Sequence, residues 1–216
     1  MIRQWLSAAV LAAVTVFFIS ACSEAPDPEA SGNGGFVTGK HYLVLDYPVQ
    51  QGNTEPFLVE YLWVGCPYCQ RIEPILQAYK DQHPEVSMVR IHGALTQRWT
   101  VDGSIFHALE MKAERDIAPE MLEFYASKAP DLPDGEDLTD FIESLGFDPD
   151  EVFAMASSAE VAGILETSFN DMQQNNIRGV PAIVVNGRYV LANPLPEDIV
   201  SDEDYFALLN YLLTRD

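Results

Sequence analysis

The sequence predicts a mixed α/β fold in which a strand–helix–strand unit and a strand–strand–helix unit flank an inserted all-helical segment. Short β-branched and aromatic runs gather near the two ends of the folded region, whereas apolar residues between them recur at helical spacing. The pair Asn186-Gly187 also stands between two apolar runs, which is a strong hairpin signal. Together these patterns place a sheet at both ends of the chain and helices in its middle.

The first unit begins at residues 41–47, which alternate weakly and predict an edge strand. Residues 57–64 have the length and composition of a buried strand. Residues 70–80 then carry apolar side chains at helical spacing, so we expect a helix from Cys66, and residues 87–92 predict a further strand. Such a unit joins two parallel strands through a right-handed crossover.

The helical pattern runs from about residue 99 to residue 176, with Pro- and Asp-rich breaks. Asp137 and Asp148 are the predicted N-caps of two of its helices, and a long helix is expected over 160–174. We assign these apolar positions to the core.

The last unit contains strands at 182–185 and 188–191 and a terminal helix capped by Ser201. We therefore divide the folded part into a sheet domain, residues 39–98 and 164–216, and a helical insertion, residues 99–163.

The N-terminal residues predict a secretory signal. Arg3 precedes an apolar stretch over residues 6–19 that is too short to predict a membrane span with confidence. The segment ends in Ile19-Ser20-Ala21-Cys22, which resembles the lipobox of bacterial lipoproteins. That resemblance implies a signal peptide over 1–21 and a lipidated Cys22 at the head of a flexible tether, residues 22–38. Ordinary cleavage nearby or an uncleaved anchor are the alternatives.

The charge balance argues against two classes of partner. The chain has 33 acidic and 12 basic residues and a net charge of −21, so we expect no electrostatic binding to nucleic acid or anionic lipid. It contains no Gly-rich phosphate loop and no HExxH motif, so we expect no cofactor and no metal.

The motif Cys66-Pro67-Tyr68-Cys69 carries the chemistry. Residues three apart on a helix face each other, so the two cysteines can form a disulfide. The free N–H groups and positive dipole of a first helical turn favour a thiolate, which is a good leaving group in disulfide exchange. A zinc site usually needs four ligands, and the four histidines are scattered; a purely structural disulfide closing so short a loop gains little stability. Redox chemistry is therefore favoured over both alternatives.

This order of elements, with CPYC opening the first helix and Gly179-Val180-Pro181 leading into the last hairpin, resembles the thioredoxin fold. The helical insertion makes the chain resemble the DsbA family of periplasmic thiol oxidases, over roughly residues 40–214. The likeness is sharpest in the segments FLVEYLWVGCPYCQRIEPIL and IRGVPAIVVNGRYVL.

The resemblance implies a role for each residue of the motif. Cys66 would be the exposed nucleophile of low pKa, and Cys69 the buried resolving thiol. Pro67 and Tyr68 would tune the thiolate. The best-known family members carry His at the position of Tyr68, and Tyr cannot supply that positive charge, so we expect a weaker oxidant.

Further residues enter through the same resemblance. Pro181 would be a cis-proline against the disulfide, with the Val180 backbone pairing to an extended substrate peptide; an ordinary trans proline is the alternative. Glu60, Glu73 and Arg90 stand where the family has charged groups under the active site. A buried carboxylate there has a raised pKa and could accept the proton of Cys69. The alternative is that Glu60 faces solvent and that Glu73 and Arg90 have plain surface roles.

These expectations combine into one leading function. The chain would be a monomeric, lipid-anchored oxidase of the bacterial cell envelope, facing the periplasm and donating the Cys66–Cys69 disulfide to exported proteins with free cysteine pairs. The resemblance implies reoxidation by a DsbB-like membrane quinone reductase. Whether the anchor lies in the inner or the outer membrane stays open, since Ser23 after Cys22 hints at the outer one. The alternatives are a reductase or dedicated thiol partner of one client, and a peptide-binding or chaperone module, which the retention of both cysteines disfavours.

Overall fold

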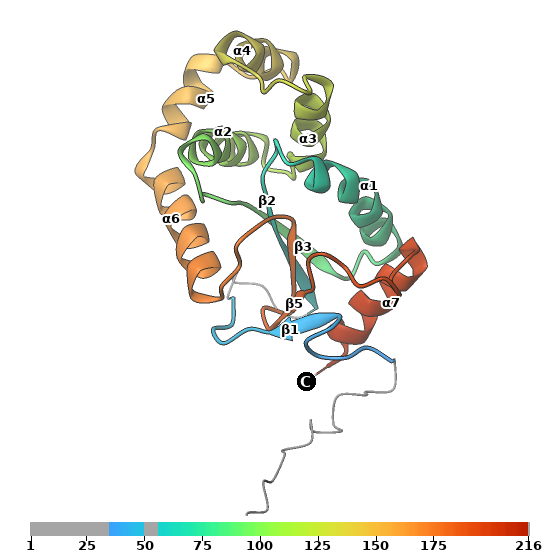
Figure 1. Ribbon diagram of the computed structural model, residues 1–216. Helices are drawn as coiled ribbons and strands as arrows, with labels where there is room; N and C mark the ends of the chain where they lie inside the picture. Colours follow the sequence, from blue (N-terminus) through green and yellow to red (C-terminus); the bar gives the residue numbers. More distant parts are fainter. Residues whose placement is uncertain (1–34, 50–55, 216) are drawn as a thin grey trace, which may run out of the picture.

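The computed structural model describes residues 35–49 and 56–215 (Figure 1). The predicted signal, Cys22 and most of the predicted tether lie outside the described residues. Within these residues the elements are, in chain order, β1 (Tyr42–Val44), β2 (Phe57–Leu62), α1 (Pro67–Gln82), β3 (Ser87–His92), α2 (Gln97–Ala113), α3 (Ala118–Ser127), α4 (Gly135–Ser144), α5 (Pro149–Ala156), α6 (Ala159–Gln174), β4 (Ala182–Val185), β5 (Tyr189–Leu191) and α7 (Asp202–Leu213). This is the predicted order of elements, and the mixed α/β fold is confirmed.

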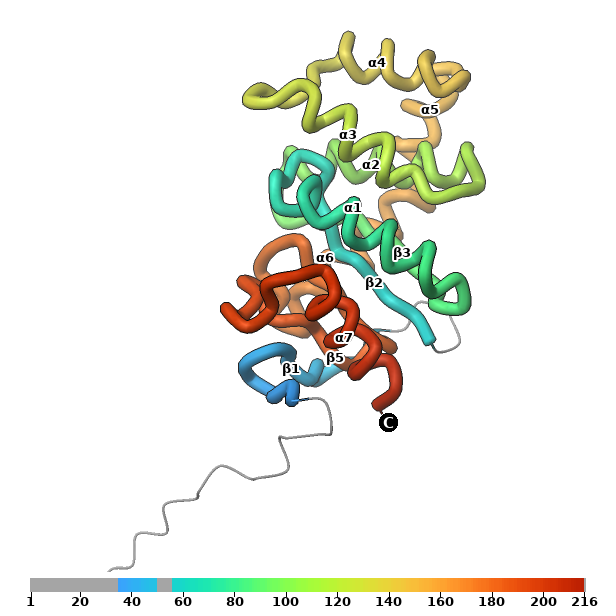
Figure 2. Tube along the Cα trace, turned by 90° about the vertical axis from the view of Figure 1, so that its right-hand side faces the viewer, coloured from blue at the N-terminus to red at the C-terminus, as the bar shows by residue number. Residues whose placement is uncertain are grey.

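The five strands form one sheet in the order β1-β5-β4-β2-β3. Only β2 and β3 run parallel, as the strand–helix–strand pattern predicts, and the other neighbours are antiparallel. Side chains alternate between the two faces of a strand, so Leu58 of β2 packs in the cluster formed with α1 and α7, whereas Val59 and Tyr61 pack towards Met172 of α6. Figures 1 and 2 show α1 and α7 on one face of the sheet and α6 on the other.

The hairpin between β4 and β5 depends on its glycine. Asn186 and Gly187 have φ values of 47° and 68°, the left-handed region that a tight hairpin turn requires. A Cβ on Gly187 would lie 2.2 Å from the carbonyl oxygen of Val49. The sequence signal at this turn therefore reflects both backbone conformation and the close approach of another segment.

Helices α2 to α5 gather beyond the end of β2 that leads to Cys66 (Figure 1). Their buried residues, among them Phe106 and Met121, share one apolar cluster with Val64, Cys66 and Cys69. The helical segment thus covers the cysteine motif as well as its own core. In the part of the chain that the structure describes, no helix has the length and apolarity needed to cross a membrane.

The helix starts agree with the sequence in two of three cases. Asp148 caps α5 and Ser201 caps α7, each accepting a backbone N–H of the first turn. The assignment of Asp137 was wrong: Asp134 is the N-cap of α4, and the carboxylate of Asp137 accepts the N–H of Asp134 at 3.1 Å. Aspartates at both positions satisfy free N–H groups, so composition alone does not tell them apart.

Candidate active site

The two cysteines stand at the start of α1. Cys66 is the N-cap residue, its N–H donates to the carbonyl of Trp63 at 2.8 Å, and Cys69 lies within the first turn. A buried strand that runs directly into a helix fixes this position, because Pro67 at the first helical position needs no N–H partner. Both cysteines are free thiols, so the structure describes the dithiol form of the motif.

Cys66 is less exposed than the sequence led us to expect. Only 7% of its surface is accessible, whereas neighbouring Tyr68 is 66% exposed and Cys69 is fully buried. The thiol of Cys66 points at the carbonyl oxygen of Val180, 3.6 Å away, and Trp63 and Val180 pack against its cluster. The prediction of an exposed nucleophile was therefore wrong: Cys66 is accessible over only a small part of its surface, because the loop that contains Val180 lies against the sulfur.

The surroundings of the two thiols move their pKa values in opposite directions. A hydrogen bond from Cys69 is the main cause that lowers the pKa of Cys66 to about 6; burial opposes it, while the N–H groups of Cys69 and Tyr68 and the charge of Arg71 assist. Burial, followed by the hydrogen bond to Cys66, raises the pKa of Cys69 far above its ordinary value. At neutral pH the pair therefore holds one thiolate, on Cys66, and one thiol, on Cys69.

The loop before β4 completes the mouth of the site. The Val180–Pro181 peptide bond is cis, as the resemblance implies. The carbonyl oxygen of Val180 lies 3.6 Å from Sγ of Cys66 and accepts its proton only while this sulfur is a thiol, and the carbonyl of Pro181 accepts from Nδ2 of Asn193 at 2.8 Å. The backbone beside Cys66 is thus held in place from two sides.

A buried charge cluster lies beneath the motif. Glu60 of β2 is directly opposite Arg90 of β3 in the parallel register, with 3.5 Å between Arg90 Nη1 and Glu60 Oε2. Glu73 of α1 also binds the guanidinium, through Nη1 and, at 3.2 Å, through Nη2. All three are buried, and Glu60 is only 1% exposed, so the alternatives of a solvent-facing Glu60 and of surface roles for Glu73 and Arg90 are wrong.

Sequence reasoning missed a fourth member of this cluster. Asp116, in the loop between α2 and α3, places Oδ2 3.2 Å from Nε of Arg90. The other carboxylate oxygen of Asp116, Oδ1, accepts the N–H of Ala118 at the start of α3. An aspartate just before a helix start is the one local sequence signal that could have indicated a structural role for Asp116. The helical segment therefore contributes an acid to the charge cluster below the sheet domain's motif.

Glu60 is the member whose protonation is most perturbed. Neither of its carboxylate oxygens has a hydrogen-bond partner among the described residues. Burial raises its pKa to about 8, Arg90 partly offsets this, and the negative charges of Glu73, Asp116 and Cys66 raise it further. Glu60 is therefore mostly protonated at neutral pH, and when it ionises its negative charge raises the pKa of Cys69, so the two groups are electrostatically coupled.

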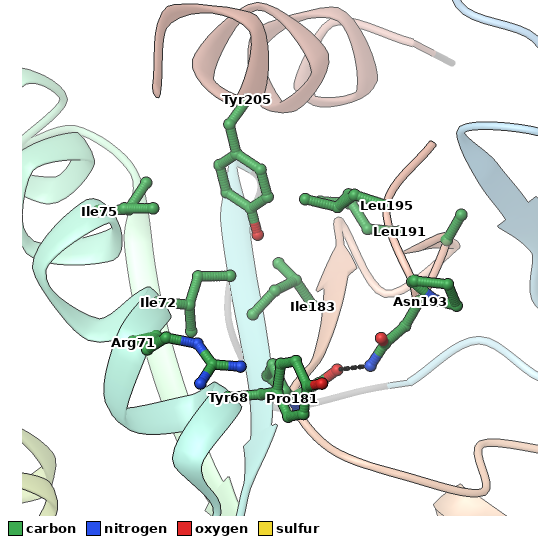
Figure 3. A pocket seen from close by; sticks show the side chains of 12 residues that line it. Tyr68, Arg71, Ile72, Ile75, Pro181, Ile183, Leu191, Asn193, Leu195 and Tyr205 are labelled. Carbon is green, nitrogen blue, oxygen red and sulfur yellow. Dashed lines mark hydrogen bonds between the residues drawn. The ribbon is translucent and has the colours of Figure 1, made fainter. Parts of the chain in front are cut away.

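An apolar groove with a volume of about 270 Å³ opens beside the motif (Figure 3). Its walls come from α1, from Pro181 and β4, from the segment after β5 and from α7. The apolar lining residues include Ile72, Ile75, Ile183, Leu191 and Leu195. No local sequence pattern predicts this groove, because its walls come from segments that are far apart in the chain. Among residues 35–49 and 56–215, no three His, Cys, Asp or Glu side chains form a group that could hold a metal ion.

Comparisons with known proteins agree with this geometry. Residues 58–203 match the family model described as DSBA-like thioredoxin domain. The thiol:disulfide interchange protein DsbA of Pseudomonas aeruginosa is 30% identical over 192 residues, covering 87% of this chain and 85% of that protein. Its namesake from Yersinia pestis is 29% identical over 195 residues, covering 83% and 89%. The crystal structure of Pseudomonas aeruginosa DsbA matches with a TM-score of 0.71 at 26% identity, over 85% of this chain and 95% of that one.

Proposed function

Because this chain belongs to the DSBA-like thioredoxin domain family and is a thiol:disulfide oxidoreductase, we propose that it works as an oxidase. It donates the Cys66–Cys69 disulfide to exported proteins that carry free cysteine pairs. The observation that carries this proposal is the opposite displacement of the two pKa values, lowered at Cys66 and raised at Cys69. A stabilised Cys66 thiolate favours the reduced form of the pair, and a pair with a stable reduced form is a strong oxidant.

Two exchanges at sulfur perform the oxidation. A client thiolate attacks Sγ of Cys66, the client–Cys66 disulfide forms, the Cys66–Cys69 bond breaks and its electron pair leaves on Cys69. The second client thiolate then attacks the client sulfur of this mixed disulfide and expels Cys66 as a thiolate. The client loses two electrons to the cysteine pair. Since Cys66 has a pKa of about 6, it is a good leaving group in the second exchange.

Glu60 supplies the proton that the first exchange needs. Cys69 leaves as a thiolate in an apolar cluster that strongly disfavours its charge. A protonated Glu60 can neutralise it, because its pKa of about 8 keeps it protonated at neutral pH. Arg90 then stabilises the carboxylate that remains, and Glu73 positions Arg90.

The client is held by backbone and by the groove. An extended peptide pairs with the Val180 backbone beside cis-Pro181, which tolerates many sequences. The apolar groove next to Pro181 receives a side chain of the same peptide. Pro67 and Tyr68 border the reacting sulfur, and both are exposed.

The cellular setting is also a proposal. The protein acts in the bacterial cell envelope, facing the periplasm, held to a membrane by a lipidated Cys22 after removal of residues 1–21. It is a monomer with a tether over 22–38 and a helical insertion over 99–163, and a DsbB-like membrane quinone reductase restores the disulfide. Which membrane holds it decides whether that partner is within reach.

The reduction potential of the Cys66–Cys69 pair tests the oxidase proposal. Equilibration with glutathione buffers of defined ratio should give a value near the oxidising end of the scale, about −120 to −160 mV, the upper limit being the potential of DsbA. A value near the −270 mV of thioredoxin would refute the oxidase and favour the reductase alternative. A Cys66→Ser protein that still complements a deletion strain would instead support the chaperone module.

A further inference from the structure

The apolar groove beside the motif has one charged lining residue, Arg71, within the described part of the chain. Its guanidinium lies over the ring of Tyr68, 4.1 Å from the ring centre. Figure 3 shows Arg71, Tyr68 and Pro181 together at one end of the groove and Tyr205 at the other. A positive charge therefore stands at the end of the groove that adjoins the reacting sulfur.

Arg71 has no acidic partner within 4 Å, a property it shares with Arg178, Arg188 and Arg215 among the described residues, but it is the one of these four that lines the groove. Seven other cations in the described ranges have an acidic partner within 4 Å, namely Lys40, Lys80, Arg90, Arg98, Lys112, Arg115 and Lys128. Within residues 35–49 and 56–215, Arg71 forms no ion pair and no hydrogen bond. The contact with the Tyr68 ring leaves the guanidinium N–H donors without a partner among the described residues, and such donors can bind a carboxylate in bidentate fashion.

A second polar group without a partner lies at the far end of the groove. Tyr205 of α7 is only 3% exposed, and its hydroxyl has no hydrogen-bond partner among the described residues. Figure 3 shows this hydroxyl directed into the groove between Ile72 and Ile183. A buried hydroxyl without a partner is costly, and an occupant with a polar atom at this depth would satisfy it.

We propose that the groove selects client segments in which an acidic residue stands next to an apolar one. The client carboxylate binds Arg71, the apolar side chain lies against Ile72 and Leu195, and a polar atom of the same segment reaches the Tyr205 hydroxyl. The occupant is a client peptide because the Arg71 end of the groove adjoins Cys66 through Pro181 and Val180. This inference rests on the proposed oxidase function and names the substrate class of that site.

The net charge of the protein opposes a preference for acidic clients. At −21, the long-range field attracts basic peptides and repels acidic ones. A preference for acidic clients must therefore come from a short-range contact, and Arg71 is the groove cation that provides it. If the groove cation played no part, the field alone would favour lysine over glutamate in the client.

The test compares matched peptides with the oxidised full-length protein. Each peptide carries a cysteine pair and a leucine, and Glu, Gln or Lys is placed in turn at the two positions on either side of the first cysteine. We expect kcat/KM to favour Glu over Gln by about three- to fivefold at one position or more, the size expected of a solvent-exposed ion pair. Arg71→Met should bring the Glu/Gln ratio to one or below, because only the repulsive field of the protein then acts on the client carboxylate, and Arg71→Glu should favour Lys.

Using ratios separates recognition from reactivity. The charge of Arg71 also stabilises the Cys66 thiolate, so its removal changes the rate for every peptide, but this change cancels between two peptides that differ only in Glu and Gln. Arg188→Met is the matched control, since Arg188 is likewise exposed and lies over a tyrosine ring, 5.6 Å from its centre, away from the groove. It should leave the ratio unchanged.

Tyr205→Phe tests the far end of the groove. It should raise KM for the leucine-containing peptides and leave kcat unchanged, because the fold makes no hydrogen bond to the hydroxyl. An unchanged KM would show that clients do not reach this depth. Equal kcat/KM values for the Glu and Gln peptides in the unmodified protein would overturn the proposed selection by Arg71 and leave the oxidase function standing. Failure to oxidise any of the peptides would overturn the proposed oxidase function itself.

Discussion

Replacing Glu60 with glutamine should make the protein more stable at neutral and alkaline pH. In the folded state burial raises the pKa of Glu60 from 4.5 to about 8. Between these two values the unfolded chain loses the proton while the folded protein keeps it, so stability falls as pH rises. The loss reaches about 3 kcal/mol at pH 7 and about 5 kcal/mol above pH 8, at about 1.4 kcal/mol per tenfold change in proton affinity.

Glutamine is a suitable replacement because the oxygens of the Glu60 side chain make no hydrogen bond among the described residues. The amide is therefore no worse placed than the protonated carboxyl. Arg90 keeps its contacts with Glu73 and Asp116 in the variant. The change therefore removes the ionisation of residue 60 and little else.

Urea unfolding of the oxidised proteins at pH 5, 7 and 8.5 measures the effect. The oxidised form is chosen because its cysteines do not titrate. Glu60→Gln and the unmodified protein should differ by less than about 1 kcal/mol at pH 5 and diverge with rising pH. The divergence should be slightly smaller than the amounts given above, because the oxidised form lacks the Cys66 thiolate, whose charge is the smallest cause that raises the pKa of Glu60. Glu123→Gln on α3, at an exposed position, should show no such divergence. A stability difference that is the same at pH 5 and pH 8.5 would refute the assignment of a protonated, buried Glu60.

Three further predictions concern the cysteine motif. Tyr68→His should raise the reduction potential, because an imidazolium beside the thiolate stabilises the reduced form; an unchanged or lower potential in glutathione buffers contradicts this. Reduced Cys69→Ala should accumulate mixed disulfides with client proteins that already hold a disulfide, because the Cys66 thiolate breaks that bond, expels one client thiolate and has no Cys69 to release the product; their absence on non-reducing gels would remove Cys66 as the reacting sulfur. Alkylation of the reduced protein should reach half its maximal rate near pH 6, where Cys66 titrates, and a midpoint near pH 9 would show an unperturbed thiol.

Some features of the site follow from local sequence. The strand before the motif is buried at all six of its positions, and its composition alone predicted a buried strand. The position of Cys66 at a helix start follows from the change of period after Gly65 and from Pro67. Ser201 and Asp148 were recognisable as N-caps because a cap bonds to N–H groups two or three residues away.

Other features exist only in the folded protein. The carbonyl that covers Cys66 belongs to Val180, 114 residues further along the chain, and Asp116 meets Arg90 from a loop of the helical segment. The groove joins α1, the β4–β5 region and α7. By itself the sequence determined the order of the elements, the dithiol and its helix start, because periodicity, capping and turn chemistry act over a few residues. Only the tertiary structure decided how far Cys66 is covered, which acids share Arg90 and where Arg71 stands, because burial and charge pairing depend on contacts between segments that the chain itself keeps far apart.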